Sequence, residues 1–127
     1  MQPGLKGEVG LLVCEEHTAR HLGSGGVQAL ATPQMVLLME RAGVAAVDHL
    51  LPQGYRTVGV RLDVQHLAPT PVGFQVWATA ELVEAEGRQL TFRVEVHDEK
   101  ELVGEGTHQR AIIDVQRFSD RVAEKAS

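Results

Sequence analysis

The sequence predicts an α+β fold in which a curled antiparallel sheet of about five strands wraps around one long buried helix. Two observations support this prediction. A single stretch, residues 33–51, is apolar on almost every face of a helix. The stretches that follow it alternate apolar and polar residues, as strands with one buried face do. A helix that is apolar nearly all round must be buried on most sides, and a twisted, curled sheet can cover it.

The length and charge of the chain limit what it can be. With 127 residues it has the size of one domain, and we expect residues 1–127 to share one core. The formal net charge of −5 argues against nucleic acid or an anionic membrane surface as a main partner. The one cysteine, Cys14, can form no intramolecular disulfide. No signal-peptide pattern or membrane-length apolar stretch occurs, so the expected location is the cytoplasm.

The elements up to the start of the helix are predicted as follows. Residues 7–15 form a first strand, and the glycine-bearing residues 17–26 form an irregular or partly helical segment. Thr32 and Pro33 then mark a helix start, with threonine as the N-cap and proline as the first helical residue.

The helix itself has clear limits and few charges. Pro52 and Gly54 end it. Within the apolar run the only charged residues before Asp48 are Glu40 and Arg41. Two charges and a length below 20 residues make a membrane span a poor interpretation.

The remainder of the chain is predicted to be strand. Four strands are expected at residues 55–67, 74–86, 89–97 and 102–115, with a weak helix at 117–127. One strand, a long buried helix and four antiparallel strands is the order of the hot-dog architecture. A single curled sheet leaves an edge and a face exposed, and dimerisation is the usual way of covering them.

Glu40 is the first candidate for a chemical role. A carboxylate inside a mostly buried helix is costly by several kcal/mol unless it is paired, hydrogen-bonded or protonated. A partly desolvated carboxylate also suits a general base or a nucleophile. The alternative is a structural glutamate that emerges at a gap in the packing and pairs with Arg41 or with a neighbouring chain.

His66 and Thr32 are the next candidates. His66 continues the alternation of Leu62 and Val64, so it faces the apolar side at the end of its strand, as an acid, a base or a satisfied core histidine. The hydroxyl of Thr32 lies beside a helix N-terminus, a place that stabilises anions. Glu40 lies eight residues further on, about 12 Å along the axis at 1.5 Å per residue. Thr32 and Glu40 therefore line one elongated site or meet through a second subunit.

Other polar residues give weaker signals. His17 and His21 are four apart, a metal-ligand spacing on a helix, but no third ligand is evident, so no metal site is expected. His108 and Arg110 share one face of the last strand. We interpret these two as solvent-exposed polar residues of a strand rather than as a phosphate-binding site.

Several stretches resemble the hot-dog thioesterases similar to fluoroacetyl-CoA thioesterase. The most specific are ATPQMVLLMERA at 31–42 and VQHLAPTPVG at 64–73. Further matches are AELVEAEGRQLTFRVEVHD at 80–98 and GEGTHQRAIID at 104–114. The resemblance covers almost the whole chain.

The resemblance implies a site and a reaction. Thr32, Glu40 and His66 take the positions of the family's catalytic residues, and Gly59 that of a glycine whose backbone lies beside the thioester. The family works as a homodimer with its sites at the subunit interface. Its substrate is an acyl group on the sulfur of coenzyme A, and its products are a free acid and the free thiol. No cofactor is expected other than the CoA of the substrate.

One segment departs from the fluoroacetyl-specific enzyme. That enzyme has a longer lid with aromatic residues between the first strand and the helix. Here residues 21–31 read HLGSGGVQALA, which is short and has no aromatic residue. We therefore expect a more general short-chain acyl-CoA as the substrate.

The expected mechanism leaves some questions open. Glu40 attacks the thioester or activates a water, Thr32 and backbone N–H groups near Gly59 stabilise the oxyanion, and His66 orients water or moves protons. One alternative is an enoyl-thioester hydratase, for which Asp48 is a poor candidate. Another is a non-catalytic acyl-CoA-binding or regulatory protein. The acyl chain, and whether the assembly is a dimer or a tetramer, stay open.

Overall fold

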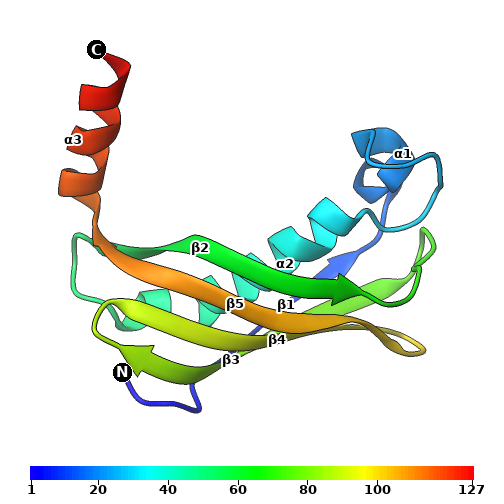
Figure 1. Cartoon of the computed structure of the whole chain (residues 1–127). Coiled ribbons are helices and arrows are strands. Elements are labelled where there is room, and N and C mark those ends of the chain that lie inside the picture. The colour runs from blue at the N-terminus through cyan, green and yellow to red at the C-terminus, as the bar shows by residue number, and fades with distance from the viewer.

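A computed structural model describes all residues, 1–127. Five antiparallel strands form one sheet around the long helix α2 (Thr32–Val47), as Figure 1 shows. The strands are β1 (Lys6–Leu12), β2 (Tyr55–His66), β3 (Gln75–Glu86), β4 (Gln89–Asp98) and β5 (Leu102–Asp114). Their order in the sheet is β1-β3-β4-β5-β2. The predicted α+β hot-dog architecture is confirmed.

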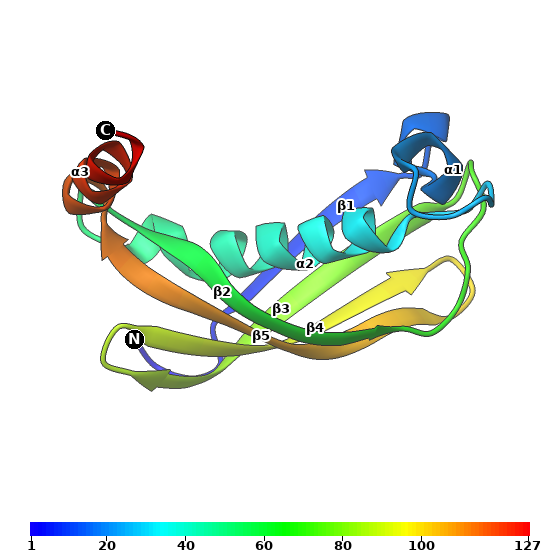
Figure 2. The same cartoon turned by 45° about the horizontal axis from the view of Figure 1, so that its top comes forward.

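The helix α2 packs against the concave face of the sheet, which curves around it in Figure 2. Its buried residues join those of the strands in a core of 17 residues, which includes Met35, Leu38, Met39 and Phe92. Each large apolar side chain buried in this way contributes about 1.5–3 kcal/mol. One face of α2 stays open, because Leu37 is 36% and Val44 is 38% exposed. The helix is thus covered on fewer sides than the sequence suggests.

The start of α2 differs by one residue from the prediction. Ala31 is the N-cap, with an extended backbone, and Thr32 is the first helical residue. The Thr32 side chain makes no capping hydrogen bond. It is therefore available for another partner. At its other end α2 runs into a short 3₁₀ turn, η2 (Asp48–Leu50).

Strand β2 has a bulge that changes which side chains face the helix. Its pairing with β5 shifts between Gly59 and Arg61. Strict alternation along residues 55–67, as the sequence predicts for this strand, would put Val60 on the face of Leu62. The bulge breaks that alternation, and Val60 is 56% exposed. The bulge places Gly59 on the side of α2, as its contacts below show. Because β2 lies at the end of the strand order, one of its edges has no partner within the chain.

The remaining segments lie at the two ends of the sheet. The turn η1 (Glu15–His17) and the short helix α1 (Ala19–Leu22) precede α2. The last helix, α3 (Val115–Ala126), has no buried residue and projects from the body of the molecule in Figure 1. None of the helices has both the length and the apolar character that crossing a membrane requires.

Candidate active site

Thr32 and His66 form a hydrogen-bonded pair where the start of α2 meets the end of β2. Thr32 Oγ1 lies 2.7 Å from His66 Nδ1. The other ring nitrogen, Nε2, is buried and makes no hydrogen bond. Burial lowers the pKa of His66 below its usual value of 6.5, and the nearby backbone of Ala68 only partly opposes this. His66 is thus mainly neutral at pH 7, with one ring nitrogen that has no hydrogen-bond partner within the chain.

A pocket of about 370 Å³ opens beside this pair. Its walls come from the segment before α2 and from the turn after β2, and more than half of its lining residues are apolar, including Val27, Leu30, Leu67 and Pro69. The two walls are joined, because the N–H of Leu30 donates to the carbonyl of Thr70 at 2.8 Å. No aromatic side chain lines the pocket. The arrangement suits a small apolar group placed next to His66.

Glu40 belongs to a second cluster. Its Oε2 lies 3.7 Å from Nη1 of Arg110, so within the chain its ionic partner is Arg110 and not Arg41, which the structural alternative had named. The Glu40 side chain is 36% exposed, whereas that of Arg110 is 6% exposed. A Cβ atom at Gly59 would lie 2.6 Å from Glu40 Oε2, so the carboxylate can approach β2 only because this residue is glycine. Two of the predicted site residues, Glu40 and Gly59, therefore lie side by side.

Arg110 and His108 were expected on a solvated face, and this expectation is wrong. Arg110 is 5% exposed and His108 is fully buried, because both face α2. Arg110 donates from Nε to Thr57 Oγ1 at 2.7 Å and from Nη2 to the Thr57 carbonyl at 3.0 Å. The signal that could have revealed them is Ile112, an apolar residue of the same alternation that packs against the core.

The hydrogen bonds of His108 fix its protonation. Nε2 lies 3.0 Å from Arg110 Nη1, which can only donate, so Nε2 accepts. The proton is then on Nδ1, which donates to the carbonyl of Arg61 at 2.9 Å. Burial lowers the pKa of His108, and the positive charge of Arg110 lowers it further against the opposing effects of Arg61 and Glu40. His108 is therefore a neutral part of the support behind Glu40.

The two clusters do not meet within one chain. No hydrogen bond or ion pair joins Glu40 to Thr32 or His66. Gly59 and His66 are seven residues apart on β2, about 23 Å at 3.3 Å per residue. Both clusters lie along the strand whose outer edge is free.

The remaining candidates carry no comparable chemistry. His17 and His21 do not share a helix, because α1 begins at Ala19. Ligand atoms of Cys14, Glu16 and His17 do lie within 4.8 Å of one another. However, His17 Nδ1 accepts the N–H of Cys14 at 2.8 Å, so in its neutral form the proton occupies Nε2, and the group is not organised to bind a metal.

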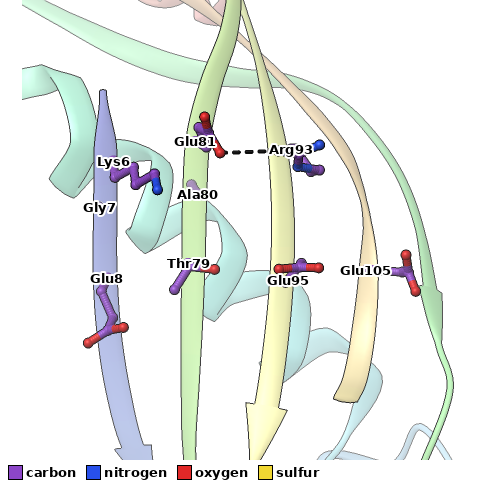
Figure 3. Close-up of a pocket in the computed structure, with 9 residues that line it drawn as sticks. All are labelled: Lys6, Gly7, Glu8, Thr79, Ala80, Glu81, Arg93, Glu95 and Glu105. Carbon is purple, nitrogen blue, oxygen red and sulfur yellow. Dashed lines mark hydrogen bonds and ion pairs between the residues drawn. The ribbon is translucent and has the colours of Figure 1, made fainter. Parts of the chain in front are cut away.

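A larger hollow of about 680 Å³ lies on β1, β3 and β4, with α2 behind the strands in Figure 3. Its charged side chains include Lys6, Glu8 and Glu95, and one ion pair, Arg93 to Glu81 at 3.1 Å, crosses it. It contains no histidine, cysteine or serine. Nothing in it matches a nucleophile with a base.

Comparisons with known proteins agree on one family. The sequence model described as "FlK: Fluoroacetyl-CoA-specific thioesterase" matches residues 13–116. The fluoroacetyl-CoA thioesterase of Streptantibioticus cattleyicolor is 43% identical over 98 residues, which cover 77% of this chain and 70% of that protein.

Solved structures extend the likeness to the whole fold. A threonine-to-serine mutant of FlK in complex with acetyl-CoA is 36% identical, with 100% of both chains covered and a TM-score of 0.94. A hot-dog-like protein from Thermanaerovibrio acidaminovorans is 24% identical, with 100% of this chain and 94% of that chain covered and a TM-score of 0.91. The second likeness supports the fold alone.

Proposed function

Because this chain belongs to the family of fluoroacetyl-CoA-specific thioesterases, we propose that it hydrolyses the thioester of a short-chain acyl-CoA to a free acid and coenzyme A. The observation that carries the proposal is the bond of 2.7 Å between Thr32 and His66 at the mouth of an apolar pocket. A hydroxyl, an imidazole with a free nitrogen and an apolar pocket are the parts that acyl transfer from a thioester needs.

In this proposal Glu40 begins the reaction as a base or as a nucleophile. As a base it takes a proton from water, whose oxygen bonds to the carbonyl carbon, and the carbon–sulfur bond then breaks to release the CoA thiolate. As a nucleophile its own oxygen bonds to that carbon first, the carbon–sulfur bond breaks to release the CoA thiolate, and water then hydrolyses the resulting anhydride to the free acid and the carboxylate of Glu40. Its position supports either role, since Arg110 balances its charge while 36% of the side chain stays exposed. Trapping an acyl-enzyme, or oxygen-18 from water found in Glu40, indicates the nucleophilic route.

Thr32 and His66 serve the carbonyl oxygen and the protons. The Thr32 hydroxyl lies in the first turn of α2, where the helix dipole and the hydroxyl stabilise a developing oxyanion. His66 uses Nε2 to orient water, or to accept a proton and pass it to the leaving thiolate. Backbone N–H groups near Gly59 are a further donor set for the oxyanion.

We infer that the complete site forms between two chains. An antiparallel pairing of β2 with a second copy of β2, related by a two-fold axis through residue 63, puts the bulge at Gly59 and Val60 opposite the partner's His66. Glu40 of one chain then faces the partner's Thr32 and the partner's His66. The free edge of β2, with Val60 56% and Leu62 37% exposed, supports this arrangement. Solution mass measurements distinguish the homodimer from a tetramer.

The proposed acyl group is short and need not carry fluorine. The segment of residues 21–31 closes the pocket with Ser24, Gly25 and Val27, and no aromatic ring restricts the acyl position. We also propose that the protein is located in the cytoplasm.

A thiol-release assay over a panel of acyl-CoAs tests the function. We expect release from acetyl-CoA or a similar short-chain thioester, and a loss of at least about a hundredfold in kcat for Glu40→Ala. The exposed Glu84 provides the matched control, since Glu84→Ala changes a carboxylate outside both clusters. Release by no substrate, or equal release by Glu40→Ala, contradicts the proposal. Hydration of crotonyl-CoA without thiol release indicates the hydratase alternative, and CoA binding without turnover indicates a binding protein.

A further inference from the structure

A chain of hydrogen bonds, buried at Arg110 and partly buried at Asp48, runs from behind Glu40 to the end of α2, and the proposed reaction gives Asp48 and Thr57 no role. Asp48 Oδ1 accepts the hydroxyl of Thr57 at 2.6 Å, and Asp48 Oδ2 accepts the Thr57 N–H at 3.2 Å. The same hydroxyl oxygen accepts Nε of Arg110 at 2.7 Å. Thr57 and Arg110 are each 5% exposed. These residues come from three elements, η2, β2 and β5.

We propose that Asp48 and Thr57 are positioning residues for catalysis, which hold the guanidinium of Arg110 against Glu40. The inference rests on the proposed function, since it concerns the carboxylate that attacks or activates water. It assigns a role in the reaction to two residues that do not touch the substrate.

The geometry leaves Arg110 a single orientation. Its Nε and Nη2 are bound by the Thr57 hydroxyl and carbonyl, and its Nη1 is bound by His108. Behind it, a Cβ atom at Gly43 would lie 3.1 Å from Arg110 Cδ, so the arginine stem is packed closely against α2. A flexible cationic side chain is thereby immobilised before any substrate binds.

The way Arg110 faces Glu40 is useful for chemistry. At 3.7 Å Nη1 is beyond hydrogen-bond distance, and it donates to His108 instead. The cation therefore balances the charge of Glu40 without occupying the lone pairs that must bind a water or attack a carbonyl carbon. An arginine that turned by one rotamer would either bind Glu40 directly or leave its charge unbalanced.

Asp48 is needed because Arg110 is itself buried. Burial lowers the pKa of Arg110, and the carboxylates of Asp48 and Glu40 oppose that effect. Glu40 alone cannot fix the direction of the guanidinium, since it makes no hydrogen bond to it. Asp48 orients the Thr57 hydroxyl with its lone pair toward Arg110 Nε, because that hydroxyl donates its one proton to Asp48.

A double-mutant cycle on kcat tests this role, with a short-chain acyl-CoA that the wild type hydrolyses. We expect Asp48→Asn and Thr57→Val each to lower kcat by about 10- to 100-fold and to change KM by less than about threefold. Thr57→Ser, which keeps the hydroxyl, should stay within about threefold of the wild-type kcat. In an Arg110→Gln background, Asp48→Asn should cause no further loss, because its effect passes through the arginine.

The control is Asp120→Asn, which removes an exposed carboxylate of α3 outside both clusters. The proposal is overturned if the losses of kcat from Asp48→Asn and Arg110→Gln multiply in the double mutant. It is also overturned if folded Asp48→Asn and Thr57→Val keep the wild-type kcat, or if these two variants change only KM. Circular dichroism and thermal melts identify the folded fraction. If Asp48→Asn does not fold, the near-isosteric Thr57→Val takes its place in the cycle. A wild type that hydrolyses no acyl-CoA refutes the proposed function, and the positioning role with it.

Discussion

At the scale of single residues, the candidate site consists of side chains that hydrogen bonds or an ion pair hold in position. Thr32 and His66 restrain each other through one hydrogen bond of 2.7 Å, and His66 keeps Nε2 unbound. Glu40 is arranged differently. Its ionic partner Arg110 is held in place by other residues, and Glu40 makes no hydrogen bond to that arginine. Each cluster therefore offers one uncommitted atom, a ring nitrogen or a carboxylate oxygen, to a reactant.

Gly59→Ala tests how closely Glu40 must approach β2. The new Cβ would lie 2.6 Å from Glu40 Oε2, so the carboxylate must move away from its place beside Arg110. We expect kcat to fall by about tenfold or more, with a loss of about 1–2 kcal/mol in the free energy of unfolding. Steady-state kinetics and urea denaturation measure the two effects.

The matched control for that variant is Gly10→Ala. There the new Cβ would lie 3.0 Å from the end of the Gln75 side chain, which can move aside. A Gly59→Ala enzyme with the wild-type kcat would show that the position of Glu40 is not critical.

The pH dependence of hydrolysis tests the role of His66. Burial lowers the pKa of His66 below 6.5. The neutral, proton-accepting form of the ring therefore already predominates at pH 6.5. If the free enzyme needs neutral His66, kcat/KM rises with pH through that lowered pKa and is level above it. The rising limb should disappear in His66→Gln. A limb centred above 6.5, or one that His66→Gln leaves in place, argues against this role.

At the scale of elements, the turn between β2 and β3 is anchored so that it can form a wall of the pocket. The Thr70 hydroxyl donates to Asp98 Oδ2 at 2.9 Å, and Asp98 Oδ1 accepts the N–H groups of Lys100 and Glu101 at 2.8 and 2.9 Å. The carbonyl of Thr70 in turn accepts the N–H of Leu30. The β4–β5 turn thus supports the segment that precedes α2.

Asp98→Asn tests this anchor through acid denaturation. Burial would raise the pKa of Asp98, but the bonds from Lys100, Glu101 and Thr70, with the charge of Lys100, lower it overall. The ionised form therefore stabilises the fold above the unfolded pKa of about 3.9, and this stabilisation is lost as the pH falls through the lower folded pKa. We expect Asp98→Asn to cost about 1–3 kcal/mol at pH 7 and progressively less below pH 4.

Urea denaturation between pH 3 and pH 7 measures that difference. Asp120→Asn, in the exposed helix α3, is the control and should follow the wild type. A destabilisation by Asp98→Asn that is the same at pH 3 and pH 7 contradicts the assignment of the effect to the ionised carboxylate.

At the scale of the whole molecule, periodicity predicted the fold well because α2 and the strands bury one consistent face each. It failed where one residue changed the alternation, as at the β2 bulge beside Gly59. It also failed where polar residues were buried with partners distant in sequence, since nothing local to His108 or Arg110 shows that Thr57 and Glu40 lie opposite them. Resemblance indicated Thr32, Glu40 and His66, but only the three-dimensional structure shows that Glu40 lies in a different cluster from Thr32 and His66.

Subunit complementation tests the composite site. A Glu40→Ala chain retains Thr32 and His66, and a His66→Ala chain retains Glu40 and Arg110, so a mixed dimer paired through β2 has one intact site and one site that lacks both residues. After random exchange in an equal mixture, half of the dimers are mixed, and we expect about a quarter of the wild-type activity per chain. Glu40→Ala mixed with Arg110→Gln should recover nothing, because Glu40 and Arg110 belong to the same cluster of one chain. Thiol release measures the activity of the mixture, and co-purification of chains with two different tags shows that mixed dimers have formed. Recovery in neither mixture would place the whole site within one subunit.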